Sequence, residues 1–138
     1  MSTSCKFKIG QTITHAELIN EFWCGNMGGM RRSRATNSLI IISDHTKKLY
    51  KDEWFDNILH YTGMGKNDDQ DLFFMQNKTL AQSDTNGVVV YLFEVLVPTK
   101  YIYRGVVALA DKPYQQIQNG ADGIPRKVWI FPLKLQTQ

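Results

Sequence analysis

The ten residues from Val88 to Val97 read Val-Val-Val-Tyr-Leu-Phe-Glu-Val-Leu-Val, and this stretch decides the fold class. Valine and aromatic residues favour strands because their stiff side chains fit a pleated, buried surface. The Asn86-Gly87 pair just before them is typical of a turn. The run is much shorter than the ~20 apolar residues that a membrane helix needs. We therefore predict a long β-strand in a soluble protein without a membrane span.

Further strands are predicted on both sides of this stretch. They share apolar runs rich in β-branched or aromatic residues, bounded by polar or turn-forming residues. Because Pro132 lacks a backbone N–H, it suits an edge strand or a bulge. The predicted strands are Ser38 to Ser43, a shorter one from Asn57 to Thr62, Tyr101 to Leu109, and a closing strand from Lys127 to Leu135.

Two short helices are expected beside these strands. Thr14 and Glu17 form a capping box, so a helix should run from about Thr14 to Glu21 and end at Gly25. Asp71 could cap a second helix that continues through Ala81. Four or five strands with two short helices indicate an α+β domain on a curved sheet or small barrel. The 138 residues suffice for one core, so residues 1–138 are expected to be a single domain.

Positive charge is concentrated in one part of the chain. The net charge is only +3, which by itself does not identify a nucleic-acid partner. Between Phe22 and Lys51, however, Asp44 is the only acidic residue, and the net charge of that stretch is +5. A basic zone beside glycines and aromatic residues suits phosphate contact, although a merely solvated face remains the alternative. The basic residues are Arg31, Arg32, Arg34, Lys47, Lys48 and Lys51.

Catalytic machinery is not recognisable in the sequence. His15, His45 and His60 are scattered, without the spacing of a helical metal site. Cys5 and Cys24 suggest neither a disulfide framework nor a zinc site. A phosphate-binding loop, a nucleophile elbow and a zinc deaminase pattern are all absent. We expect no catalysis, no cofactor and no metal, and the polar N-terminal start favours a cytoplasmic location.

Two polar-aromatic clusters carry the functional signal, residues 49–54 and residues 60–65. A pocket for an extruded base needs aromatic faces to stack on it and polar groups to read its edge. Tyr50 and Tyr61 could supply the faces, and the Asp52 carboxylate could accept the N4 amino group of cytosine. Thr62 suits contact with a 5-methyl or 5-hydroxymethyl group, and Gly63 lets the backbone approach. The alternative is that both tyrosines pack in the core and Asp52 caps a turn.

Several motifs, in this order, resemble the SRA (SET and RING associated) domain family. The likeness runs from Phe22 to Leu135 and is greatest to the short bacterial SRA-like domains of HNH-type, modification-dependent restriction endonucleases. It implies a crescent-shaped, PUA-like β-barrel with flanking helices that flips 5-methylcytosine out of duplex DNA. The motifs are Tyr61-Thr62-Gly63-Met64-Gly65, Asp69-Gln70, Asn77-Lys78-Thr79-Leu80-Ala81 and Val128-Trp129.

The resemblance assigns roles to individual pocket residues. The family's stacking tyrosine before Thr-Gly falls on Tyr61, and its methyl-contacting threonine falls on Thr62. Its base-reading aspartate, nine positions upstream of the tyrosine, falls on Asp52. Tyr50 is the second stacking face, although its offset differs by one from the family pattern, and Trp54 is the substitute.

The loop from Asn26 to Arg32 lies where the family places a thumb that enters the DNA groove. Met27, Met30 and Arg31 are therefore candidates for the wedge that fills the space of the flipped base. This assignment leaves the choice among the three open. The residues expected to contact the DNA backbone or groove are Asn26, Met27, Met30, Arg31, Arg32, Arg34, Lys47 and Lys48.

Two stretches depart from the family pattern. The Tyr-Asp-Gly motif becomes Tyr103-Arg104-Gly105, and residues 80–88 are too few for the long finger of larger members. The predicted function is recognition of 5-methylcytosine or 5-hydroxymethylcytosine in double-stranded DNA, with a fused or partner HNH nuclease in a bacterial restriction system. The alternatives are a PUA-like RNA-binding module, an enzyme acting on a nucleotide or modified base, and a structural interaction domain.

Overall fold

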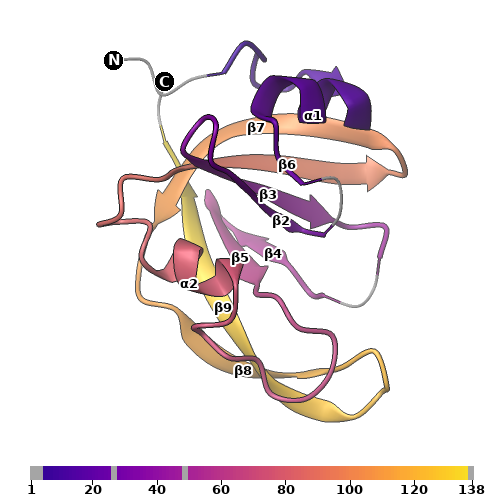
Figure 1. Ribbon diagram of the computed structural model, residues 1–138. Helices are drawn as coiled ribbons and strands as arrows, with labels where there is room; N and C mark the ends of the chain where they lie inside the picture. The colour runs from indigo at the N-terminus through magenta and orange to yellow at the C-terminus, as the bar shows by residue number, and fades with distance from the viewer. Residues whose placement is uncertain (1–4, 26–27, 48–49, 137–138) are drawn as a thin grey trace.

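The computed structural model describes residues 5–25, 28–47 and 50–136, and most of its regular structure is β-strand (Figure 1). Within these residues nine strands belong to one sheet, and two short helices lie on different sides of it. The helices are α1 (His15–Phe22) and α2 (Gln76–Ala81). The strands are β1 (Thr12–Ile13), β2 (Met30–Ser33), β3 (Ser38–Asp44), β4 (Glu53–Phe55), β5 (Ile58–Thr62), β6 (Val89–Val97), β7 (Lys100–Leu109), β8 (Tyr114–Asn119) and β9 (Pro125–Leu135).

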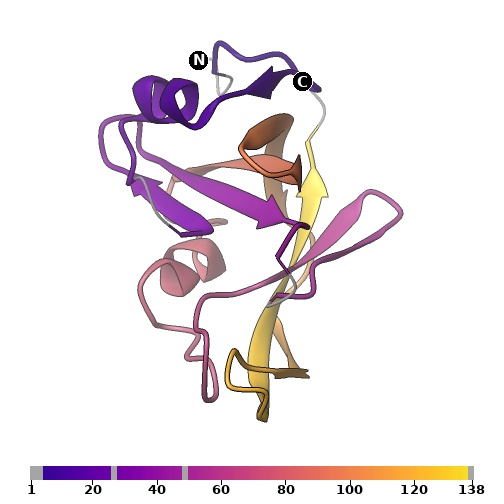
Figure 2. The same ribbon diagram turned by 90° about the vertical axis from the view of Figure 1, so that its right-hand side faces the viewer.

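The strands follow the order β2-β3-β6-β7-β9-β5-β4, with β1 added to β7 and β8 added to β9. Strands β3 and β6 are parallel, and the other pairs are antiparallel. Figure 2 shows the strong twist of the sheet and the length of β9, drawn in yellow. Within the described residues the path does not close from β4 back to β2, so the sheet is open. A sheet with flanking helices confirms the coarser prediction, whereas closure into a PUA-like barrel stays a prediction.

Both faces of β3 are buried, which explains its uninterrupted aliphatic run. Leu39 and Ile41 point into the cluster that includes Leu80 of α2. Ile40 and Ile42 point into the opposite cluster, where α1 packs. Successive side chains of a strand point to opposite faces, so a strand covered on both sides must be apolar at every position. The two clusters together fix β3 and β6 at the centre of the molecule.

Helix α1 matches the predicted bounds of about Thr14 to Glu21 to within one residue, but it does not end at Gly25. The Thr14 side chain accepts a hydrogen bond from the Glu17 backbone, and the Glu17 side chain accepts one from the Thr14 backbone. The helix ends at Phe22 because Trp23 adopts a left-handed conformation with φ of 53°. The Trp23 N–H closes the last turn on the Ile19 carbonyl, 2.8 Å away. The prediction that Gly25 ends the helix was therefore wrong.

The second predicted helix is much shorter than expected. Asp71 caps a turn, with its Oδ1 accepting from the Phe73 N–H at 2.9 Å. Met75 then has φ of 47°, which no α-helix accommodates, so α2 begins only at Gln76. Residues 71–75 form a turn, and the prediction of a continuous helix from Asp71 was wrong.

Other corrections concern strands. The predicted loop from Gly25 to Arg32 already contains the start of β2 at Met30. Strand β9 is not at an edge, because it pairs with β5 on one side and with β7 and β8 on the other. Pro132 is tolerated there because it falls between the β8 ladder, which ends at Ile130, and the β7 ladder, which begins at Leu133.

Candidate functional site

Asp52 is held by two hydrogen-bond donors from different strands. The Thr62 backbone N–H donates to Oδ1 at 2.7 Å, and the Ser43 hydroxyl donates to Oδ2 at 2.8 Å. Burial raises the pKa of the Asp52 carboxyl, and these two donors oppose that shift without cancelling it. Each carboxylate oxygen keeps a second lone pair, so the group can still accept a hydrogen bond from a ligand.

Tyr61 is anchored beside this carboxyl. Its hydroxyl donates to the carbonyls of Gly29, at 3.0 Å, and Ile42, at 3.1 Å. Only 4% of the residue is exposed, and burial raises its pKa far above the ordinary tyrosine value, with the charge of Asp52 adding to the shift. The hydroxyl therefore stays neutral, and it fixes the ring against the ends of β2 and β3.

Tyr50 approaches the same place from the segment that precedes β4. Burial raises its pKa, while a backbone hydrogen bond from Gly65 and the charge of Arg126 lower it. The charge of Asp52 also acts on Tyr50, and Tyr50 in turn acts on Tyr61. The structure thus brings together the two tyrosines and the aspartate that the sequence singled out.

Thr62 closes one side of this cluster and is 2% exposed. Its hydroxyl donates to the Lys51 carbonyl at 3.3 Å and accepts from the Gln118 side chain at 3.2 Å. Gln118 also accepts from the Lys51 N–H at 3.4 Å. Sequence reasoning missed Gln118, because a glutamine in a polar strand far along the chain carries no local signal. We call Tyr50, Asp52, Tyr61, Thr62 and Gln118 the pocket cluster.

The loop from Gly63 to Gly65 is clamped by two buried amide side chains. Gln70 donates to the carbonyls of Gly63, at 2.7 Å, and Gly65, at 3.1 Å. Asn77 accepts from the Met64 N–H at 2.7 Å and donates to the Met64 carbonyl at 3.1 Å. A Cβ on Gly63 would lie 2.8 Å from the Asn77 Oδ1, which explains the glycine. The clamp fixes the backbone next to Thr62.

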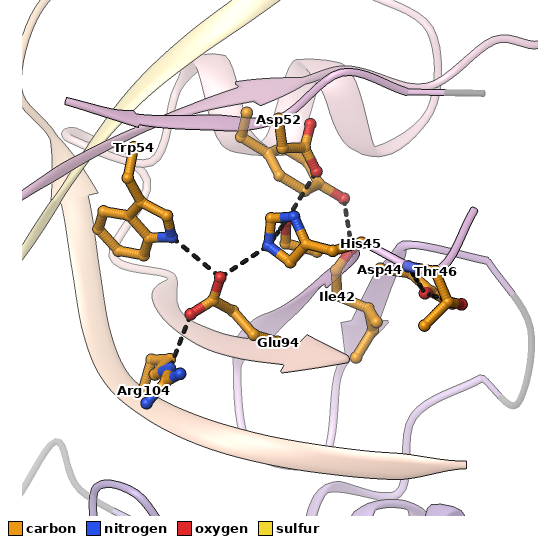
Figure 3. Close-up of polar contacts among 10 residues, drawn as sticks. Ile42, Asp44, His45, Thr46, Asp52, Trp54, Glu94 and Arg104 are labelled. Atoms are coloured by element: carbon orange, nitrogen blue, oxygen red, sulfur yellow. Dashed lines mark hydrogen bonds and ion pairs between the residues drawn. The ribbon is translucent and has the colours of Figure 1, made fainter. Parts of the chain in front are cut away.

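Trp54 is not among the pocket cluster, although it was the substitute stacking face. Its indole N–H donates to Glu94 Oε2 at 2.9 Å, and its ring packs against the core. Glu94 also accepts from Arg104, at 2.7 Å, and lies 2.7 Å from His45 Nε2 (Figure 3). Burial would raise the pKa of Glu94, but hydrogen bonds from Trp54, Arg104 and His45 outweigh it and leave the pKa lowered.

The predicted DNA-contacting residues are placed unequally. Met30 lies in the core, and Arg31 is only 6% exposed, with its Nε donating to the Gly28 carbonyl and its Nη1 2.9 Å from His15 Nε2. Arg32 is partly buried and donates to the Ser38 carbonyl and to Asn37 Oδ1. Arg34 and Lys47 are exposed. Asn26, Met27 and Lys48 lie outside the described residues.

Arg126 contributes a buried cation near the pocket cluster. Its Nη1 donates to the carbonyls of Gly65 and Asp68, which ties β9 to the clamped loop. Nε and Nη2 have no hydrogen-bond partner within the described part of the chain. Among the described residues, no ion pair joins Arg126 to an acidic side chain. Its positive charge lowers the pKa of Tyr50.

Across residues 5–25, 28–47 and 50–136, no three His, Cys, Asp or Glu side chains gather as metal ligands would. Both cysteines are free thiols, and burial raises the pKa of each. No helix in the described ranges has the length and apolarity needed to cross a bilayer.

Comparison with known proteins identifies the class to which this fold and site belong. A family model described as "ScoMcrA-like, SRA domain" matches residues 9–136. The chain therefore belongs to the ScoMcrA-like SRA domain family, in agreement with the resemblance of its motifs. A search of curated protein sequences gave no significant match.

Solved structures show the same fold at low sequence identity. The sulfur binding domain and SRA domain of ScoMcrA, complexed with phosphorothioated DNA, is 17% identical with a TM-score of 0.79, covering 96% of this chain and 41% of that one. The Type IV phosphorothioation-dependent restriction endonuclease ScoMcrA has the same TM-score, sequence identity and coverage of this chain. The match covers 29% of that endonuclease chain. The SUVH5 SRA complex with hemi-methylated CG DNA is 21% identical with a TM-score of 0.71, covering 100% of this chain and 94% of that one. This chain thus spans less than half of the two ScoMcrA chains.

Proposed function

We propose that this chain is a DNA-binding reader domain that accepts a modified cytosine, flipped out of a duplex, at the pocket cluster. The observation that carries the proposal is the Asp52 carboxyl, fixed by Thr62 and Ser43 beside two tyrosines. Membership of the SRA family supports it. The similar structures of ScoMcrA and SUVH5 are complexes with phosphorothioated and methylated DNA, and this also supports the proposal. Binding of modified DNA by this chain is part of the proposal.

The chemistry of the cluster fits cytosine better than thymine. Cytosine presents an N4 amino donor, which the free lone pairs of Asp52 accept, whereas thymine presents a carbonyl at that position. Stacking on an aromatic face contributes about 1–3 kcal/mol per base, and flipping costs a few kcal/mol. Two tyrosine faces thus roughly offset the cost of flipping, and phosphate contacts must supply the remaining affinity.

Phosphate contacts are assigned to the basic residues that reach solvent. Arg34 and Lys47 are exposed, and Arg32 is partly so. Such contacts release counterions and give affinity that does not depend on sequence. Lys48 continues this basic segment in the sequence. The 5-position of the base is assigned to Thr62, whose methyl and hydroxyl groups suit 5-methylcytosine or 5-hydroxymethylcytosine.

We further propose that the domain is the specificity module of a modification-dependent restriction system. The similarity to part of ScoMcrA, a restriction endonuclease of which the match covers 29%, supports this assignment. Cleavage is then supplied by a fused or partner nuclease, for which an HNH module is our proposal. The reader domain itself would bind and select the DNA.

Binding to matched duplexes tests the reader function. The duplexes carry cytosine, 5-methylcytosine or 5-hydroxymethylcytosine at one position, and binding is measured at physiological salt with single-stranded and structured RNA as competitors. We expect tighter binding to a modified duplex, and loss of that preference in Asp52→Ala. Asp84→Ala, a change at an exposed turn residue, is the matched control. Equal affinity for all three duplexes contradicts the proposal, and stronger binding to RNA favours an RNA-binding module.

A further inference from the structure

A hydrogen-bonded network leads from Glu94 in β6 to Asp52. Glu94 lies in β6 and is 4% exposed, and Trp54, Arg104 and His45 converge on its carboxylate (Figure 3). His45 Nε2 also lies 3.3 Å from Ser43 Oγ. The Ser43 hydroxyl in turn donates to Asp52. The connected groups are thus Arg104, Glu94, His45, Ser43 and Asp52.

The chemistry of Glu94 fixes the direction of the hydrogen bonds. Its lowered pKa and the N–H donors of Trp54 and Arg104 make it an ionised acceptor. At 2.7 Å from this acceptor, His45 Nε2 must carry a proton. That N–H faces the Ser43 oxygen as well. The Ser43 oxygen therefore accepts from His45. Its own hydroxyl proton is then donated to Asp52.

We propose that Ser43, oriented by His45 and Glu94, is a positioning residue that keeps Asp52 an acceptor and so selects a flipped base with a 4-amino group over one with a 4-carbonyl group. This inference rests on the proposed function. It names the device by which the pocket cluster distinguishes 5-methylcytosine from thymine, which carries the same 5-methyl group.

The reason lies in the burial of Asp52. Burial favours the neutral acid, and the Ser43 hydroxyl is one of the donors that oppose it. Without that donor the neutral acid becomes easier to form. A neutral carboxyl can donate to the O4 carbonyl of thymine, whereas a carboxylate repels it. Loss of the Ser43 hydroxyl should therefore narrow the preference for the amino-bearing base.

Ser43→Ala tests the inference with two duplexes that carry 5-methylcytosine or thymine opposite the same guanine. Hydrogen bonds to charged groups are worth enough for the affinity ratio to fall about tenfold in the variant. Thr46→Val is the control, because the Thr46 hydroxyl binds Asp44 in the same turn and does not touch the network. A folded Ser43→Ala protein that keeps the wild-type ratio overturns the inference.

His45→Ala guards against a folding defect, since Ser43 is fully buried whereas His45 is exposed. Releasing Ser43 in this way should narrow the ratio of 5-methylcytosine to thymine affinity in the same direction as Ser43→Ala does. An unchanged ratio in His45→Ala shows that His45 does not orient Ser43, and it overturns that step of the inference.

A measurement without DNA separates this inference from the proposed function. NMR titration of the Asp52 carboxyl should show its midpoint at higher pH in Ser43→Ala than in wild type. An unshifted midpoint overturns the role of Ser43 whatever the DNA data show. If wild-type protein fails to prefer modified duplexes, the proposed function fails. If wild type prefers them and the variant keeps the 5-methylcytosine to thymine ratio, the inference alone fails.

Discussion

Gly29 faces Tyr61 so closely that a Cβ on the glycine would lie 2.9 Å from the tyrosine hydroxyl and 3.3 Å from the Ile42 carbonyl. Both contacts belong to the hydrogen bonds that anchor the Tyr61 ring. The absent side chain of Gly29 is thus what allows β2, β3 and β5 to meet at the pocket cluster.

Gly29→Ala should therefore destabilise the protein by about 1–3 kcal/mol, as overpacking of a buried site commonly does. Denaturant unfolding measures this cost. Gly25→Ala is the matched control, because nothing lies within 4 Å of its would-be Cβ, and it should change stability by no more than about 0.5 kcal/mol. Equal stability of the two variants would show that Tyr61 is not held against Gly29.

Tyr61→Phe separates the anchor from the stacking face. The change removes the hydroxyl donor from the Gly29 and Ile42 carbonyls, although the Gly29 carbonyl keeps the Ile42 N–H, and it should cost about 1–3 kcal/mol. The ring remains, so a folded variant should keep its preference for modified cytosine. Tyr114→Phe, which removes a hydroxyl from an exposed residue that contacts His60, serves as control. Loss of the preference in folded Tyr61→Phe would give the hydroxyl a direct role in binding.

The pH dependence of stability should report on Asp52. Its pKa is raised in the folded protein, so the folded chain binds this proton more tightly than the unfolded chain. This proton contributes its full stabilisation of the folded state at pH values below the ordinary pKa of aspartate. The contribution is lost as the pH rises from that ordinary pKa through the raised pKa of Asp52 in the folded protein. Asp52→Asn cannot ionise, so it should lack this decline when unfolding is followed across the acidic range. A variant with the same slope as wild type contradicts the raised pKa.

Glu94 should change the pH dependence of stability in the direction opposite to Asp52. Its pKa is lowered in the folded protein, so its contribution is present above the ordinary glutamate range and is lost as pH falls through the folded value. A Glu94→Gln variant should therefore show a shallower loss of stability on acidification than wild type. Because Arg104 loses its partner, the variant should also be less stable at neutral pH.

The parts of the fold that could be predicted are those with a local signal. The run from Val88 to Val97 and the Thr14 capping box gave β6 and the start of α1. Strand β8, from Tyr114 to Asn119, has no apolar alternation, and it forms because β9 supplies a partner along its full length. Propensity alone could not find a strand whose stability comes from tertiary pairing.

The candidate site likewise contains some residues that the sequence could identify and others that it could not. The spacing of Asp52 and Tyr61 could be recognised, and the structure brings the two side chains together. Ser43 and Glu94 gave no signal, because the Ser43 contact depends on how the chain turns back at Asp52, and the Glu94 contact joins residues 40 positions apart in the sequence. Arg31 was misleading, since a charge in a basic stretch suggests the surface, whereas this guanidinium satisfies the Gly28 carbonyl and contacts His15.

The burial of Arg31 changes what its substitution should do. An exposed phosphate-contacting residue lowers the affinity for all duplexes and reduces the salt slope by about one when it is removed. Arg34, which is exposed, should behave in this way in Arg34→Ala. Arg31→Ala should instead lower stability, because it removes a buried hydrogen bond to the Gly28 carbonyl, and it should leave the slope of affinity against salt near the wild-type value. Binding to unmodified duplex over a salt series, with unfolding measured in parallel, distinguishes the two. A reduced slope in folded Arg31→Ala would mean that this guanidinium leaves its buried position to contact phosphate when DNA binds.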